Sequence, residues 1–324
     1  MKKVLAVVLV AVLAVSFAAC GGSKGAAVKT GLAVAGVIED VKETTLTIDV
    51  VAAAVTVDAD GKIVDVKIDE AQTKPDLAKA DADYGVDLRT KYEKKADYGM
   101  KDTSAAIPGG IGKEWFEQAD AFMDWAKGKT AEDIRAAVNA EGKTDNADLK
   151  AGCTITIETI AETVAKAVDN AADLGAKADD KLALSVKTEK YYESNETNLQ
   201  YDTNVAAVTT DASGKITSCL IDAAQGKCAM ADGKFTVKEG TFLSKKDLKE
   251  NYAMKDTSAA IPGGIGKEWF EQAKAYEDWA IGKTAADVKA AVNAEGKTDD
   301  ADLKAGCTIT ISSIAETVAA AAQA

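Results

Sequence analysis

The segment "AAVTVDADGKIVDVKIDEAQTK", residues 53–74, decides the expected fold. Two runs rich in Val and Ile flank Asp58-Ala59-Asp60-Gly61-Lys62, which contains the Asp and Gly that tight turns prefer. The second run, 63–68, alternates apolar and polar side chains, as a strand with one buried face does. The segment therefore predicts an antiparallel hairpin. A related segment, "AAVTTDASGKITSCLIDAAQGK", follows at 206–227, so we expect the hairpin twice.

The chain of 324 residues is internally repeated. "MKDTSAAIPGGIGKEWFEQA" at Met100–Ala119 recurs letter for letter at Met254–Ala273, a separation of 154 residues. "AVNAEGKTD" and "ADLKAGCTITI" also occur twice. This period is too long for a solenoid and close to the commonest size of one domain. We therefore expect two similar tandem domains, over residues 31–172 and 173–324.

Helices are expected to follow the hairpin in each repeat. Apolar residues at helical spacing predict one helix over Lys113–Lys127, after the loop "IPGGIG" at 107–112. Gly128 ends it, and the capping-box-like segment 130–133 starts a second helix. A last helix starts at 159–162, after "DLKAGCTIT" at 148–156, whose alternating Thr and Ile are typical of a strand. Without strict βαβ alternation, the pattern favours an α+β fold, each domain being an antiparallel sheet with packed helices.

Composition restricts the chemistry. Hydrophobic residues make up 47% of the chain and charged residues 28%, as in a globular protein. The net charge of −13 argues against nucleic acid as a partner, because no basic excess is present to neutralise phosphates. With no histidine, Ser-His-Asp and Cys-His catalysis and His metal sites are excluded. No spaced carboxylate pair stands out either, so an electron carrier or binding protein is expected rather than a catalyst.

The first residues indicate export. Lys2-Lys3 precede an apolar run over 4–15, and small residues then lead to Cys20, which predicts a signal peptide over 1–19. Cys20 resembles the lipidated cysteine of a bacterial lipobox, and 20–30 is expected to be a flexible tether. We expect a lipoprotein anchored on the extracytoplasmic face of the bacterial membrane. A plain signal peptide with a chance cysteine is the alternative.

Four further cysteines follow. Cys219 and Cys228, nine residues apart across a predicted hairpin, are candidates for a disulfide, which an extracytoplasmic location permits. Whether they pair is left open by the sequence. Cys153 and Cys307 occupy equivalent positions in the two repeats and are expected to be buried as small hydrophobic residues.

The loop "IPGGIG" has two interpretations. A Gly-rich loop before a helix leaves backbone N–H groups free for an anion, with Lys113 adding charge. Alternatively, the loop is a tight turn that places Trp115 in the core. "GKT" at 128–130 and 282–284 lacks the earlier Gly of a phosphate-binding loop, so it is interpreted as a helix end followed by a helix cap. Among the aromatic residues of the predicted helix, Trp125 is the best candidate for partial exposure.

The order of these motifs resembles the FMN-binding domain family, which includes flavinylated subunits of Rnf and sodium-pumping quinone reductase complexes and extracellular flavin lipoproteins. In that family a loop like Thr-Pro-Gly-Leu-Gly precedes a helix, and FMN is attached at Asp-x-x-Ser/Thr-Gly-Ala-Thr/Ser. Here Ala151 and Ala305 replace the Ser/Thr, and Cys153 and Cys307 replace the Ala. The residues matching the attachment motif are Asp148, Gly152 and Thr154, and Asp302, Gly306 and Thr308.

The resemblance implies FMN, either joined covalently to Thr154 and Thr308 by a flavin transferase or bound without a covalent bond. It implies two flavins that relay electrons to a redox partner. The alternative is the same fold without redox chemistry, which captures a small ligand or a partner in a pocket near 108–112. The loop glycines that the resemblance places at the cofactor are Gly109, Gly110, Gly112, Gly263, Gly264 and Gly266.

Overall fold

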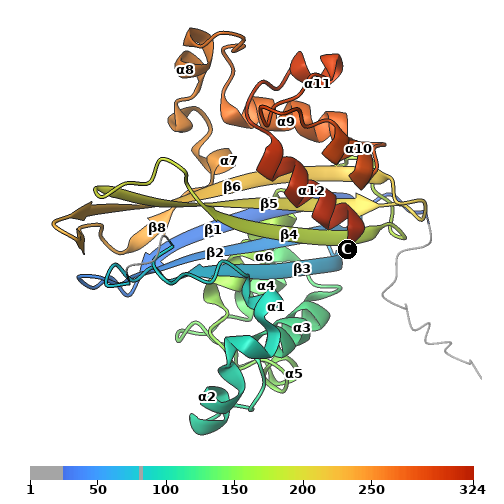
Figure 1. The fold of residues 1–324 in the computed structure, drawn as a ribbon. Helices are drawn as coiled ribbons and strands as arrows, with labels where there is room; N and C mark the ends of the chain where they lie inside the picture. Colours follow the sequence, from blue (N-terminus) through green and yellow to red (C-terminus); the bar gives the residue numbers. More distant parts are fainter. Residues whose placement is uncertain (1–24, 80–82) are drawn as a thin grey trace, which may run out of the picture.

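The computed structural model describes residues 25–79 and 83–324 (Figure 1). The predicted signal peptide, Cys20 and the first part of the predicted tether lie outside these residues. The strands are β1 (Lys29–Glu39), β2 (Thr47–Val57), β3 (Ile63–Thr73), β4 (Lys181–Lys190), β5 (Asn198–Thr210), β6 (Ile216–Ala231), β7 (Lys234–Phe235) and β8 (Gly240–Phe242).

The helices form two similar series, one after each set of strands. The first repeat has α1 (Lys91–Lys94), η1 (Lys95–Tyr98), α2 (Met100–Ala106), α3 (Trp115–Ala126), α4 (Ala131–Ala136), α5 (Ala147–Lys150) and α6 (Glu158–Asp169). The second has α7 (Lys245–Leu248), η2 (Lys249–Tyr252), α8 (Lys255–Ala260), α9 (Trp269–Ala280), α10 (Ala285–Ala290), α11 (Ala301–Lys304) and α12 (Ser312–Gln323).

The strands form two antiparallel sheets with the orders β3-β2-β1-β8 and β4-β5-β6-β7. The expected α+β fold is confirmed. The predicted hairpin is β2–β3, and Asp58 Oδ1 fixes its turn by accepting from the backbone N–H groups of Asp60 and Lys62, each at 2.9 Å. The equivalent hairpin, β5–β6, has the same turn, built on Asp211.

The molecule is layered, with the two sheets in the middle and one series of helices outside each (Figure 1). Residues on the facing sides of the sheets form one core, which includes Val50, Ala52, Tyr201, Val205 and Ala207. The outer face of each sheet packs against its own helices and forms a second and a third core. Burial on both faces explains why every residue of β2 is buried.

The two repeats share one core, because residues of both sheets contribute to the cluster between them. In addition, β8 belongs to the second repeat but pairs with the edge of β1 in the first. The division at 172/173 therefore stays a prediction. The tether prediction is wrong for its last residues, since Val28 N–H donates to Ala176 O at 3.1 Å and β1 begins at Lys29.

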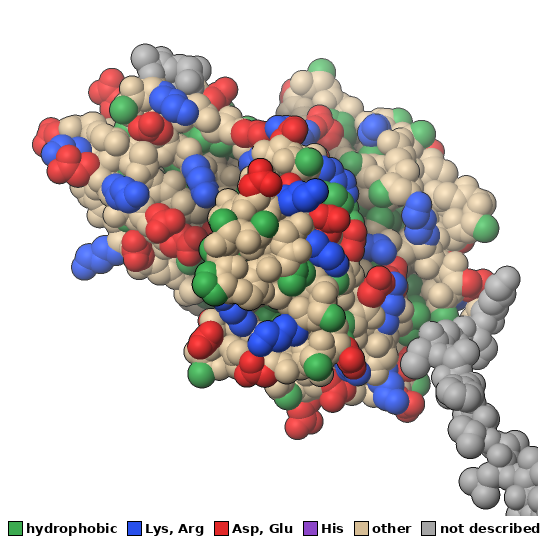
Figure 2. All heavy atoms as spheres, turned by 90° about the horizontal axis from the view of Figure 1, so that it is seen from below, with side chains coloured by type: hydrophobic (Ala, Val, Ile, Leu, Met, Phe, Trp, Pro, Cys, Tyr) green, Lys and Arg blue, Asp and Glu red, His purple; other side chains and the backbone are tan. Residues whose placement is uncertain are grey.

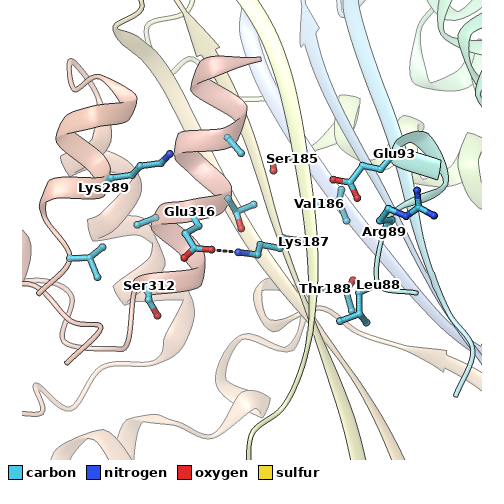
Figure 3. Close-up of a pocket in the computed structure, with 14 residues that line it drawn as sticks. Leu88, Arg89, Glu93, Ser185, Val186, Lys187, Thr188, Lys289, Ser312 and Glu316 are labelled. Carbon is cyan, nitrogen blue, oxygen red and sulfur yellow. Dashed lines mark hydrogen bonds and ion pairs between the residues drawn. The ribbon is translucent and has the colours of Figure 1, made fainter. Parts of the chain in front are cut away.

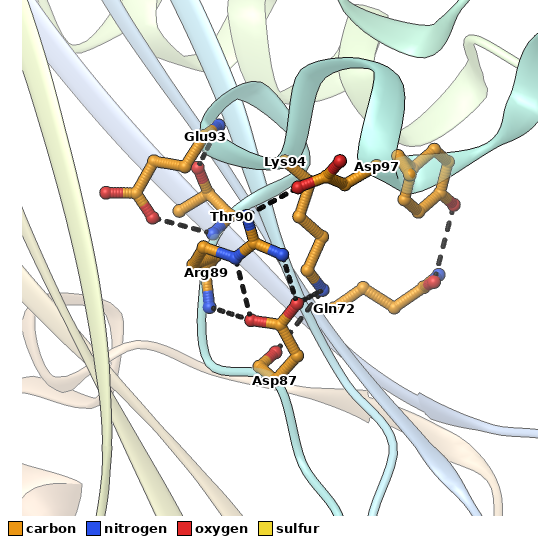
Figure 4. Close-up of polar contacts among 8 residues, drawn as sticks. Gln72, Asp87, Arg89, Thr90, Glu93, Lys94 and Asp97 are labelled. Carbon is orange, nitrogen blue, oxygen red and sulfur yellow. Dashed lines mark hydrogen bonds and ion pairs between the residues drawn. The ribbon is translucent and has the colours of Figure 1, made fainter.

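A network of hydrogen bonds and ion pairs stabilises residues 87–98, which lead from β3 to the helices (Figure 4). The guanidinium of Arg89 donates to both Asp87 and Asp97, and Thr90 and Glu93 cap α1 reciprocally. Tyr98 Oη lies 3.3 Å from Gln72 Oε1 on β3. These contacts join α1 and η1 to the end of the first sheet.

Most of the helices predicted from local sequence signals are present in the structure. The predicted helix over 113–127 is α3, and Thr130 caps α4 in a box with Asp133. The last helix was misplaced at its start, because α6 begins at Glu158 rather than at a Thr159 cap. The "GKT" interpretation is confirmed, since Gly128 ends the helical path with φ 76° and Thr130 is the cap. Among the described helices, none has the length and apolarity needed to cross a membrane.

The strand register excludes a disulfide between Cys219 and Cys228, which the sequence left open. Cys219 and Cys228 both lie in β6, not on two arms of a hairpin. Nine residues along one strand span about 30 Å, far beyond the reach of a disulfide. They also face different cores: Cys219 packs against the helices and Cys228 lies between the sheets. Cys153 and Cys307 are buried and free, as expected.

Candidate binding site

The structure has equivalent pockets in the two repeats, next to the predicted loop and threonine. The first, of about 440 Å³, is lined by Ile107, Pro108, Gly109, Gly110, Asn139, Ala140, Glu141, Lys143, Thr144, Asp145, Lys150 and Thr154. The second, of about 400 Å³, is lined by Pro262, Gly263, Asn293, Ala294, Glu295, Lys297, Thr298, Asp299, Lys304 and Thr308. We call them the N-pocket and the C-pocket.

Thr154 is held at the N-pocket by Gln118 of α3. Thr154 N and Oγ1 lie 2.8 and 3.2 Å from Gln118 Oε1, although 36 residues separate them in the chain. In the C-pocket, Thr308 has the same contacts with Gln272, at 2.9 and 3.3 Å. Both glutamines are fully buried. Sequence reasoning missed them, because a Gln inside a helix is ordinarily solvent-facing.

A second part of the pocket wall is the turn "NAEGKTD", which sequence reasoning also missed as part of the site. Asn139 Oδ1 accepts from the N–H groups of Glu141 and Lys143, each at 3.0 Å. Gly142 has φ 71°, and its carbonyl accepts from Ile157 N–H at 2.7 Å. The turn is therefore tied to the segment that carries Thr154. Its recurrence in both repeats was the available signal.

The glycines of the loop are needed for its backbone conformation. Gly109 and Gly112 have φ values of 79° and 62°, and a Cβ on Gly110 would lie 1.7 Å from Ser104 O. Of the glycines placed at the cofactor by the resemblance, only Gly109, Gly110 and Gly263 line a pocket. Gly112, Gly264 and Gly266 do not line a pocket. Like Gly112, Gly266 has a positive φ, and like Gly110, Gly264 has no room for a Cβ.

The anion interpretation of this loop stays a prediction, and the start of α3 does not favour it, because Glu114 already places a carboxylate there. Glu114 caps the helix in a reciprocal box with Glu117, and its Oε2 also accepts from Met100 N–H at 2.9 Å. A carboxylate there already satisfies the helix dipole. The tight-turn interpretation is confirmed, since Trp115 is buried in the core. Trp125 is only partly buried, as expected.

The remaining motif residues lie beside the pocket rather than in it. Asp148 and Asp302 are exposed in the short helices α5 and α11 and do not line the pockets. Gly152 packs against α3, where an added Cβ would lie 2.6 Å from Ala121 Cβ. The predicted strand after it is wrong, because Thr154 N–H bonds to a side chain and Ile157 N–H to a turn, not to a neighbouring strand.

No strong nucleophile is presented by the motif. Burial raises the pKa of the Cys153 and Cys307 thiols to about 11 each, so both stay protonated near neutral pH. The Thr154 hydroxyl contacts an amide oxygen, which is too weak a base to activate it. The arrangement can bind and orient a molecule, and does not provide the parts of a hydrolytic site.

The N-pocket does not fit FMN well. The charges of its lining residues sum to zero, because Lys143 and Lys150 offset Glu141 and Asp145. Lys150 Nζ lies 3.8 Å from Asp145 Oδ1. The described lining residues include no aromatic ring to stack on a flavin. Figure 2 shows the same interspersion of acidic and basic side chains over the face that carries the first helices. FMN therefore stays a prediction of the resemblance.

A larger cavity lies elsewhere. A groove of about 810 Å³ runs between β4, α10 and α12 and is also lined by Leu88, Arg89 and Glu93 (Figure 3). Lys187 of β4 and Glu316 of α12 form an ion pair across it (Figure 3). A smaller groove of about 570 Å³ occupies the equivalent place beside β1 and α6. Neither groove is lined by a residue of the loop or attachment motifs.

No family model, curated protein or solved structure matches the chain.

Proposed function

We propose that the protein is a non-redox binding protein that holds one small polar ligand in each of its two pockets. In this proposal Cys20 anchors it by lipid on the extracytoplasmic face of the membrane. The balanced charges of the N-pocket wall suit a ligand that carries both charges, such as an amino acid or a short peptide. The proposal adopts the non-redox alternative for this fold.

One observation carries the proposal: the segments that line the pockets are identical in the two repeats. The loop, the turn "AVNAEGKTD" and "ADLKAGCTITI" recur unchanged. By contrast, the core positions Phe122 and Met123 of α3 are Tyr276 and Glu277 in α9. Every residue that lines the N-pocket has the same amino acid at the equivalent position of the second repeat, and this agreement supports a binding role for the pocket.

The test is the stoichiometry of binding. Free amino acids and dipeptides are titrated calorimetrically, and we expect two sites on the unaltered protein. Ala140 and Ala294 are exposed on equivalent pocket walls, so Ala140→Trp or Ala294→Trp should fill one pocket and leave one site. Retention of two sites in both variants would show that binding occurs elsewhere.

The electron-carrier alternative rests on the Thr154 hydroxyl, which lines the pocket. Intact mass of protein coexpressed with a flavin transferase distinguishes the two functions. Our proposal expects no added FMN. One or two FMN masses, lost on Thr154→Ala and Thr308→Ala, would replace it with the electron carrier and its redox partner.

A further inference from the structure

The orientation of the Gln118 carboxamide is fixed by two backbone groups. The N–H of Thr154 lies 2.8 Å from one end, and the carbonyl oxygen of Lys113 lies 3.1 Å from the other. A backbone N–H can only donate and a carbonyl can only accept. The end near Thr154 is therefore the oxygen, and the end near Lys113 is the NH₂ group.

This orientation decides where the Thr154 hydroxyl proton lies. Thr154 Oγ1 is 3.2 Å from the same Gln118 Oε1, and an amide oxygen only accepts. The contact is a hydrogen bond only if the hydroxyl donates. A hydroxyl has one proton, so the Oγ1 atom has only lone pairs left to offer to the pocket that Thr154 lines. Both pockets therefore present an acceptor at this threonine, because Gln272 is fixed in the same way by Thr308 N–H and Lys267 O, at 2.9 and 3.1 Å.

We propose that each pocket selects, at Thr154 or Thr308, a ligand group that donates a hydrogen bond, and that this group is a protonated amine. The inference rests on the proposed binding function and specifies which end of the ligand meets the threonine. The carboxylates of Glu141 and Asp145 line the same pocket and can accept from the amine, while Lys143 and Lys150 are left for the opposite end of a ligand that carries both charges. A sulfate dianion has only acceptors, so its oxygens would face the lone pairs of Oγ1.

The proton position can be measured without any ligand. Neutron diffraction from deuterated crystals of the whole protein should place the Thr154 deuterium between Oγ1 and Gln118 Oε1, and the Thr308 deuterium toward Gln272. A deuterium directed into the pocket would overturn the inference and leave the binding function untouched.

The ligand preference is measured by NMR on ¹⁵N-labelled protein, with methylammonium chloride and sodium sulfate as probes and sodium chloride as the ionic-strength control. We expect methylammonium to shift the Thr154 and Thr308 amide signals, and sulfate to leave them unchanged. Thr154→Val keeps the shape but removes the acceptor, so the N-pocket should bind methylammonium about tenfold more weakly while the C-pocket is unaffected. Shifts from sulfate alone, or from neither probe, contradict the preference for an amine.

Discussion

At the scale of single residues, the most unusual group is the Asp49 carboxylate on β2. It is buried, and among the described residues its Oδ1 has no hydrogen-bond partner. Glu39 of β1 and Glu70 of β3 lie beside it, and Glu70 is paired with Lys91 of α1. Burial raises the pKa of Asp49 to about 6, and the hydrogen bond to Asp49 raises the pKa of Glu39 to about 7.

These shifts predict lower stability at higher pH. A carboxyl whose pKa is raised by folding holds its proton more tightly in the folded state. Its ionisation therefore opposes folding as the pH rises from about 4, near the unfolded pKa, through 6 to 7. Asp49→Asn should remove the cost of the buried charge and raise the free energy of unfolding at pH 8 by roughly 1–3 kcal/mol, with little change at pH 4. Urea denaturation at both pH values measures this.

The second repeat provides a matched control. Asp202 occupies the position equivalent to Asp49, but its carboxylate accepts from the amide groups of Gln200 and Gln225. Asp202→Asn should therefore not stabilise the protein at pH 8. Equal stabilisation by both substitutions would show that the pH effect does not come from the Asp49 environment.

At the scale of elements, the carboxylate cap of α3 links two helices. Glu114 caps α3 and accepts from the first N–H of α2, at Met100. Glu114→Ala should cost about 1–2 kcal/mol of stability and speed hydrogen exchange at Met100. Glu132→Ala, on an exposed position in the first turn of α4, serves as the control and should change stability by less than about 0.5 kcal/mol. Unchanged exchange at Met100 in the Glu114 variant would mean that the cap does not hold α2.

Elements with strong local signals were predictable from the sequence. The β2–β3 hairpin, α3 and α4 each carry a turn, periodicity or cap of their own. The segment "DLKAGCTIT" was mistaken for a strand because the Thr154 N–H finds its partner in the Gln118 side chain, 36 residues earlier in the chain. The proximity of Thr154 to the Gly-rich loop was anticipated from motif order, whereas Gln118 was not, since its burial depends on tertiary contacts.

At the scale of the whole molecule, the core shared by the two sheets should make both repeats unfold together. Val205 lies in that core, and Val208 lies in the core between the second sheet and its helices. We expect calorimetry to show one transition with equal calorimetric and van't Hoff enthalpies. Val205→Ala and Val208→Ala should each destabilise it by roughly 1–3 kcal/mol and keep it single. If Val208→Ala instead separates a second transition from the first, the repeats are independent domains, and the boundary predicted near residue 172 is a real folding boundary.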